Sequence, residues 1–171
     1  MPADIDESRF EAEDSHSLVE RLSYQKAKTI RDRLKKNAPP FILGADTVVE
    51  IGSEILGKPT SQAHAEAMLL KLIGNRHTVS TGVSILRRDD DESYSQVIIS
   101  QVEMRAASLR EIREYSESGE GADKAGAYAI QGRGGTFISR VIGSESNVIG
   151  LPLDEALALL RQAGYFKIDE L

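Results

Sequence analysis

Apolar positions along the chain recur with two different periods, one typical of helices and one typical of strands. Four segments carry apolar residues at helical spacing, and we expect each of them to form a helix. These segments are residues 17–36, 61–74, 108–119 and 152–164. Capping boxes at Ser17-x-x-Glu20 and Ser108-x-x-Glu111 predict where two of these helices begin. Pro152 and Gly164 predict the two ends of the last helix.

Strand-like runs lie between these helices. Phe41–Val49 is an apolar run that predicts a buried strand, and Gly52-Ser53 after it indicates a hairpin turn. Further strands are expected at residues 77–87, 94–106, 127–131 and 136–142. Helices and strands alternate but hairpins are mixed in, so the pattern predicts a single α/β domain over residues 1–171, with a mixed sheet flanked by helices.

Composition narrows the class of protein. Of the 171 residues, 40% are hydrophobic and 28% are charged, which is typical of a soluble globular protein. No apolar run approaches the roughly 20 residues of a membrane span. The acidic N-terminus does not resemble a signal peptide, and the absence of cysteine fits a reducing cytoplasm. We therefore expect a cytoplasmic protein without a membrane partner.

Charge restricts the possible ligands. The formal net charge is −6 and no stripe of Lys and Arg is present, which argues against binding to a nucleic-acid backbone. A small phosphorylated substrate remains compatible, because a few local cations suffice to bind it. The three histidines (His16, His64 and His77) are scattered and predict no metal cluster.

Asp46 is the most informative position, because it places an acid inside the apolar run 41–49. A carboxylate buried there is costly unless it is paired, hydrogen-bonded or bound to a metal. Asp46 is therefore a candidate general base or metal ligand, and Thr47 adds a hydroxyl beside it. The alternative is a structural acid that caps a nearby turn or helix.

Two lysines are candidate partners for an anion. Lys58, held between Gly57 and Pro59, is the natural partner of Asp46 and a candidate phosphate clamp; the alternative is a solvated turn lysine. Lys26 stands on or beside the apolar face of the first helix. It either extends to solvent or is a buried cation that needs an anion.

Polar residues near the start of the chain and after residue 120 complete the candidate set. Glu7 could lend a carboxylate to a metal site, although most acidic N-termini are simply solvated. Gln131 ends an apolar stretch beside glycines that permit close backbone approach, and Lys124 precedes the same stretch. An amide in that place suits the edge of a nucleobase; the alternative is a polar strand end next to a flexible loop.

The order of these motifs is more specific than any one of them. From about Asp4 to Gly164, the chain resembles the Maf family of nucleoside triphosphate pyrophosphatases, in the branch that acts on dTTP and UTP. The motifs that carry the resemblance are DIDES, YQKAK, GADTVV, LGKP, GNRHTVSTGV, DKAGAYAIQG and SNVIGLPL.

The resemblance implies a role for each candidate. Asp46 matches the catalytic acid that activates water and, with Glu7, holds a divalent cation, Mg²⁺ or Mn²⁺. Thr47 and Gln131 match positions linked to substrate choice, while Lys26, Lys58 and Lys124 are expected to bind substrate. It further implies a fold similar to inosine triphosphate pyrophosphatases, an active cleft between two lobes, homodimers, and a house-cleaning activity against non-standard nucleotides.

One departure from the family pattern bears on activity. Members usually begin with a strand and a Ser-x-Ser-Pro-Arg-Arg loop, whereas this sequence starts at Met1-Pro2, directly before the DIDES motif. We therefore expect an N-terminally truncated chain, through either a misassigned start codon or a real truncation. The alternative to an active pyrophosphatase is a weak or inactive nucleotide-binding regulator linked to septum formation.

Overall fold

The computed structural model describes residues 1–35, 39–89 and 92–165. Its contacts divide the chain into two compact units. Unit 1 comprises Met1–Asp46, Thr81–Ile98 and Gly150–Leu171, and unit 2 comprises Thr47–Ser80 and Ile99–Ile149. Three long strands run from one unit into the other.

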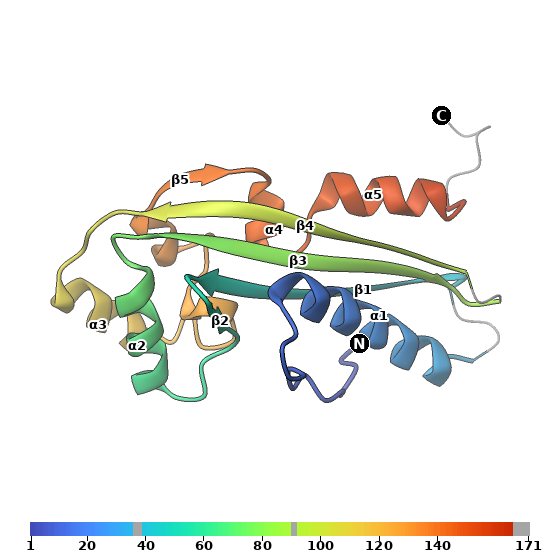
Figure 1. The fold of residues 1–171 in the computed structure, drawn as a ribbon, viewed down its shortest axis with the longest axis horizontal. Helices are drawn as coiled ribbons and strands as arrows, with labels where there is room; N and C mark the ends of the chain where they lie inside the picture. Colours follow the sequence, from blue (N-terminus) through green and yellow to red (C-terminus); the bar gives the residue numbers. More distant parts are fainter. Residues whose placement is uncertain (36–38, 90–91, 166–171) are drawn as a thin grey trace. The chain divides into compact units, whose positions relative to one another are not determined.

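A five-stranded sheet, in the order β2-β1-β3-β4-β5, is the central element (Figure 1). Its strands are β1 (Phe41–Ile51), β2 (Glu54–Leu56), β3 (Arg76–Arg87), β4 (Ser93–Met104) and β5 (Ile138–Ile142). The α/β class is confirmed, but the sheet is antiparallel and the predicted mixed sheet is wrong. The β1–β2 hairpin pairs Val49–Ile51 with Glu54–Leu56, and β5 pairs antiparallel with β4 at the other edge of the sheet. Fold similarity to inosine triphosphate pyrophosphatases stays a prediction.

Of the five α-helices in the described residues, four match the predicted segments. The helices are α1 (Ser15–Arg33), α2 (Gln62–Leu72), α3 (Leu109–Glu117), α4 (Glu145–Ile149) and α5 (Leu153–Gln162). Ser61 caps α2, and Ser108 with Glu111 forms the predicted capping box of α3. The predicted box at Ser17 is wrong, because Asp14 caps α1 and accepts a hydrogen bond from the Ser17 amide at 2.8 Å. Residue 36, the expected end of that helix, lies outside the described residues.

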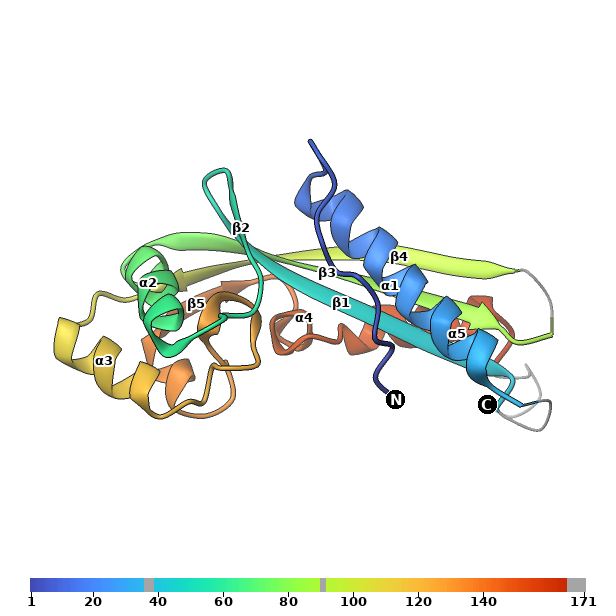
Figure 2. The same cartoon turned by 90° about the horizontal axis from the view of Figure 1, so that it is seen from below.

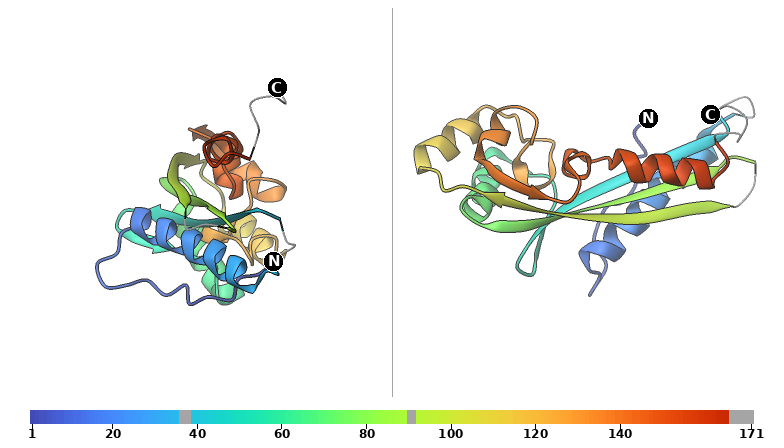
Figure 3. Two further views of the ribbon diagram at one scale, coloured as in Figure 1. Left: turned by 90° about the vertical axis from the view of Figure 1, so that its right-hand side faces the viewer. Right: turned by 90° about the horizontal axis from the view of Figure 1, so that it is seen from above.

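In unit 1, α1 and α5 cover opposite faces of the strands, as Figure 3 shows. Alternation along β3 explains the arrangement. Val83 and Ile85 pack against α5 in one cluster, whereas Leu86 packs with Ala27 of α1 in another. Ser84 shares the α1 face, and its hydroxyl lies 2.9 Å from that of Ser23.

Unit 2 is built around a larger apolar core. Residues of α2 and α3 pack on the strand ends, with Leu69, Leu72, Tyr115 and Val102 almost fully buried. The buried amide of Asn147 in α4 donates to the Val79 carbonyl at 3.1 Å and to the Ser100 hydroxyl at 2.9 Å. That short helix is not among the four helices that the sequence predicted.

The segment between α3 and β5 departs most from the predictions. Residues 127–131 form no strand; a 3₁₀ turn at Ala125–Ala127 lies there instead. Gly126 and Ala127 both have positive φ values, 69° and 61°, which an extended strand excludes. A second 3₁₀ segment, Arg133–Phe137, takes the first residues of the strand predicted at 136–142.

Among the helices in the described part of the chain, none combines the length and the apolar character that crossing a membrane requires.

Candidate active site

Asp46 lies in β1 with only 9% of its surface exposed, at the point where unit 1 ends. Its Oδ1 is 2.5 Å from the Nζ of Lys26 on α1. The sequence required a partner for this acid, and Lys26 supplies one. Lys58, which the sequence named as the natural partner, stays a prediction. The structure also decides between the two possibilities for Lys26, which is a partly buried cation paired with an anion.

Glu7 reaches the same ammonium from the segment before α1. Its Oε1 lies 2.6 Å from Lys26 Nζ, so one lysine bridges two carboxylates. Burial lowers the pKa of Lys26, but its hydrogen bonds to Asp46 and Glu7 outweigh that effect and hold the pKa above its ordinary value. Lys26 is therefore protonated at neutral pH and offsets the charge of the buried acid.

Two strand glycines bring α1 close enough for this contact. A Cβ on Gly44 of β1 would stand 2.2 Å from the Ser23 carbonyl oxygen, and one on Gly82 of β3 would stand 2.1 Å from that of Val19. Both distances are far below van der Waals contact, so only glycine fits. Glycine inside a strand is the sequence signal of such close backbone approach. The sequence analysis did not assign Gly44 and Gly82 this role.

Arg21 holds the segment that carries Glu7. Its guanidinium makes a two-pronged contact with Glu13, at 2.6 and 2.7 Å, and donates to the Ser8 carbonyl at 3.0 Å. It also lies over the ring of Phe10, 4.0 Å from the centroid. Figure 2 shows the N-terminal segment, which precedes α1 in the sequence, running alongside that helix. Sequence reasoning missed Arg21, because no local pattern shows which acid an arginine of a helix contacts.

In unit 2, the structure brings together the segments that carry Lys58 and Lys124. The Gly126 amide donates to the Gly57 carbonyl at 3.0 Å. This bond joins the two loops at the residue before Lys58 and two residues after Lys124. Lys124 pairs with Asp123 at 2.8 Å. The pKa of Asp123 is lowered mainly by that hydrogen bond, and the charge of Lys58 contributes. Two cations therefore lie on neighbouring loops.

Gln131 is exposed and follows an anchored loop. Before it, the hydroxyl of Tyr128 lies 2.8 Å from Nε2 of His77, and the Ala129 amide donates to the Tyr115 hydroxyl at 3.0 Å. Beyond Gln131, the Gly134 amide donates to Glu120 at 2.9 Å. These contacts fix the backbone on both sides of Gln131. Thr47, the remaining predicted residue, is half-buried in β1 and is the first residue of unit 2.

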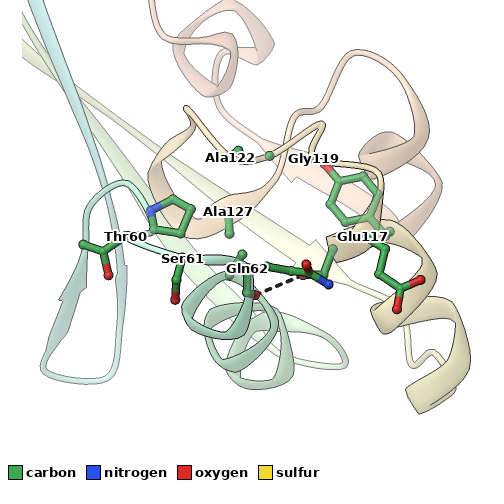
Figure 4. A pocket seen from close by; sticks show the side chains of 12 residues that line it. Thr60, Ser61, Gln62, Glu117, Gly119, Ala122 and Ala127 are labelled. Atoms are coloured by element: carbon green, nitrogen blue, oxygen red, sulfur yellow. Dashed lines mark hydrogen bonds between the residues drawn. The ribbon is translucent and has the colours of Figure 1, made fainter.

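A pocket of about 280 Å³ also lies in unit 2 (Figure 4). The start of α2, the end of α3 and the loop after α3 form its walls, with Pro59, Ser61, Tyr115 and Ala122 among the lining residues. Ser116 donates to the Gln62 carbonyl at 3.2 Å across its floor. The residues predicted to bind substrate are not among those that line this pocket.

The structure supplies part of the ligand set that the predicted metal site needs. In the part of the chain that the structure describes, no group of three or more His, Cys, Asp or Glu residues is placed to hold an ion. Glu7 and Asp46 supply two carboxylates that already converge on one cation, the ammonium of Lys26. Oxygen donors of this kind fit Mg²⁺ or Mn²⁺ in chemistry.

Fold and site together define an α/β protein in which a lysine bridges a buried and an exposed carboxylate beside the central sheet. Residues 1–163 match the family model described as Maf-like protein. The chain therefore belongs to the Maf family, as the order of its motifs predicted.

Named relatives share most of their length with this chain. It is 45% identical over 162 residues to a protein of Myxococcus xanthus named dTTP/UTP pyrophosphatase, covering 95% of this chain and 80% of the relative. A Hahella chejuensis protein of the same name is 43% identical over the same shares of both chains. A third, from Shewanella denitrificans, is 42% identical, covering 92% of this chain and 78% of the relative.

Proposed function

We propose that this protein hydrolyses nucleoside triphosphates, dTTP and UTP foremost, to the monophosphate and pyrophosphate. Relatives at 42–45% identity carry the name dTTP/UTP pyrophosphatase. The observation that carries the proposal to particular residues is the buried Asp46 bridged through Lys26 to Glu7. An acid kept in such a place is suited to accept a proton during a reaction.

In the proposed reaction, water attacks the α-phosphorus and Asp46 accepts its proton. The bond from that phosphorus to the oxygen bridging to the β-phosphate breaks, and pyrophosphate leaves with the bonding electrons. Hydrolysis of this kind depends on positioning and on neutralising phosphate charge. The positive charge that neutralises the phosphates comes from Lys26, Lys58 and Lys124. The pyrimidine base is recognised by Gln131 and Thr47.

Glu7 and Asp46 would hold the expected Mg²⁺ or Mn²⁺. When bound, such an ion supplies positive charge at the phosphate oxygens. The substrate is a small nucleotide, and we infer that the protein acts in the cytoplasm. Homodimer formation, implied by the family resemblance, is tested by light scattering coupled to size-exclusion chromatography.

The test is pyrophosphate release from dTTP and UTP by the wild type and by Asp46→Asn. The substitution keeps the shape of the side chain and removes the base, so activity should fall by about 10²–10⁴-fold, the usual contribution of a general base. Circular dichroism should show an unchanged fold. Near-normal release from Asp46→Asn would refute the base assignment. Binding of dTTP to the wild type without release would instead support the nucleotide-binding regulator.

A further inference from the structure

The ammonium of Lys26 occupies the point where two carboxylates of the candidate site converge. It lies 2.6 Å from Glu7 Oε1 and 2.5 Å from Asp46 Oδ1. These are the two residues that the family resemblance assigns to a divalent cation. The protein therefore supplies its own cation where a metal is expected.

We propose that Lys26 excludes divalent metal from Glu7 and Asp46 in the nucleotide-free protein. A Mg²⁺ ion needs oxygen ligands at about 2.0–2.1 Å and dehydrates reluctantly. An ion bound to these two oxygen atoms would stand close to the ammonium group, and the two cations would repel each other. Binding through the other oxygens of the same carboxylates still places two cations close together, where they repel each other.

The two carboxylates differ in how easily they part from Lys26. The Asp46 side chain is 8% exposed and fixed in a strand, whereas the Glu7 side chain is 47% exposed and lies before α1. The Lys26 side chain is 21% exposed, and its four-carbon stem allows the ammonium to swing while the helix stays in place. A phosphate group offers that ammonium a second anion. Metal would then enter together with the nucleotide, a consequence that rests on the proposed function.

Metal binding without nucleotide tests the inference directly. Mn²⁺ titrations followed by electron paramagnetic resonance would compare the wild type with Lys26→Met, which keeps the length of the side chain and removes its charge. We expect Lys26→Met to bind Mn²⁺ about tenfold or more tightly than the wild type, the scale on which a neighbouring charge shifts a binding equilibrium. Equal or weaker binding by Lys26→Met would overturn the proposal.

A matched control and a double variant locate the effect. Lys28, also on α1, pairs with Asp32 at 3.0 Å with both side chains half exposed, so Lys28→Met should bind Mn²⁺ as the wild type does. Adding Glu7→Gln to Lys26→Met should abolish the gain; a gain that survives would place the metal elsewhere and refute the proposal.

Lys26→Gln serves as the second variant if Lys26→Met does not fold, because its neutral amide still donates a hydrogen bond to Asp46. The same gain in Mn²⁺ affinity is expected, and its absence counts against the proposal in the same way. None of these measurements uses nucleotide or turnover. If the proposed pyrophosphatase activity were refuted, the metal-binding result would still be valid. If the metal-binding proposal were refuted, the proposed activity would be unaffected.

Discussion

The backbone of Gly44 in β1 lies directly against Ser23 in α1, with 2.2 Å between the Cβ position of the glycine and the Ser23 carbonyl oxygen. The next turn of the helix is also near, since the same Cβ would stand 2.7 Å from the Ala27 amide nitrogen. Lys26, which reaches Asp46, lies between these two contacts. The close packing of α1 on Gly44 thus sets the distance between Asp46, the candidate base, and Lys26, its counter-ion.

Gly44→Ala should destabilise the protein, because the added methyl group forces α1 away from β1. Overpacking of this kind costs about 1–3 kcal/mol, and backbone atoms yield less readily than side chains. Urea unfolding measures the loss. Gly57→Ala is the matched control, since its Cβ would meet no atom within 4 Å and its φ is not positive. Equal stability of the two variants would contradict the close-packing argument.

Arg21→Ala should release the segment that presents Glu7. The variant loses the paired contacts to Glu13 and the bond to the Ser8 carbonyl. Hydrogen bonds to charged groups contribute about 1.5–3 kcal/mol each, so amide exchange near residues 8–13 should rise by about tenfold or more. Mass spectrometry of exchange in peptides from this segment provides the measurement.

The control for Arg21 is Arg110→Ala. The Arg110 side chain is 87% exposed and pairs across one helical turn with Glu114, at 2.7 Å. Pairs of this exposed type contribute little, and exchange in α3 should change slightly. Unchanged protection of residues 8–13 in Arg21→Ala would show that another contact holds the segment.

Much of the fold, and the burial of Asp46, could be predicted from the sequence, because both depend on local signals. The periodicity of 17–36 and the apolar run around Asp46 sufficed to place α1 and β1. Burial of Asp46 also required a partner, which the structure supplies in Lys26. The contact of Lys26 with Asp46 could not be predicted from the sequence, because it depends on how closely the helix packs on Gly44.

The wrong prediction of a strand at residues 127–131 also has its cause in tertiary contacts. Ala127–Gln131 has the apolar character of a strand, but Ala127 adopts a positive φ of 61°, which sequence does not predict for alanine. Its conformation is imposed by contacts around it, including the Gly126 bond to Gly57 and the buried ring of Tyr128. Tertiary contacts override local preference there, in the loop that leads to Gln131.

His77 makes stability depend on pH. It is 2% exposed, its Nδ1 has no hydrogen-bond partner among the described residues, and burial lowers its pKa from 6.5 to about 4. The unfolded chain therefore binds a proton below about pH 6.5 and the folded protein does not. Above about pH 6.5 this group does not reduce the free energy of unfolding. That free energy falls by about 1.4 kcal/mol per pH unit as the pH drops from there toward 4.

His77→Gln removes this proton linkage. Its urea-unfolding free energy should fall less steeply between pH 6.5 and 4 than that of the wild type. His64→Gln is the control, because His64 is exposed and its ring nitrogen accepts a hydrogen bond from the Thr60 amide, near the start of α2. An unchanged slope in His77→Gln would assign the pH dependence to other groups.

Tyr115→Phe should loosen the loop before Gln131 while leaving the Asp46 site intact. The hydroxyl accepts the Ala129 amide at 3.0 Å, and without it that partly buried N–H loses its partner. An unsatisfied group of this kind costs about 1–3 kcal/mol. If Gln131 and Lys124 bind substrate as proposed, KM for dTTP should rise while kcat changes little. Tyr94→Phe, which removes an exposed hydroxyl bonded to Glu92 at 2.7 Å, provides the control. A fall in kcat at constant KM would show instead that this loop acts on the chemical step.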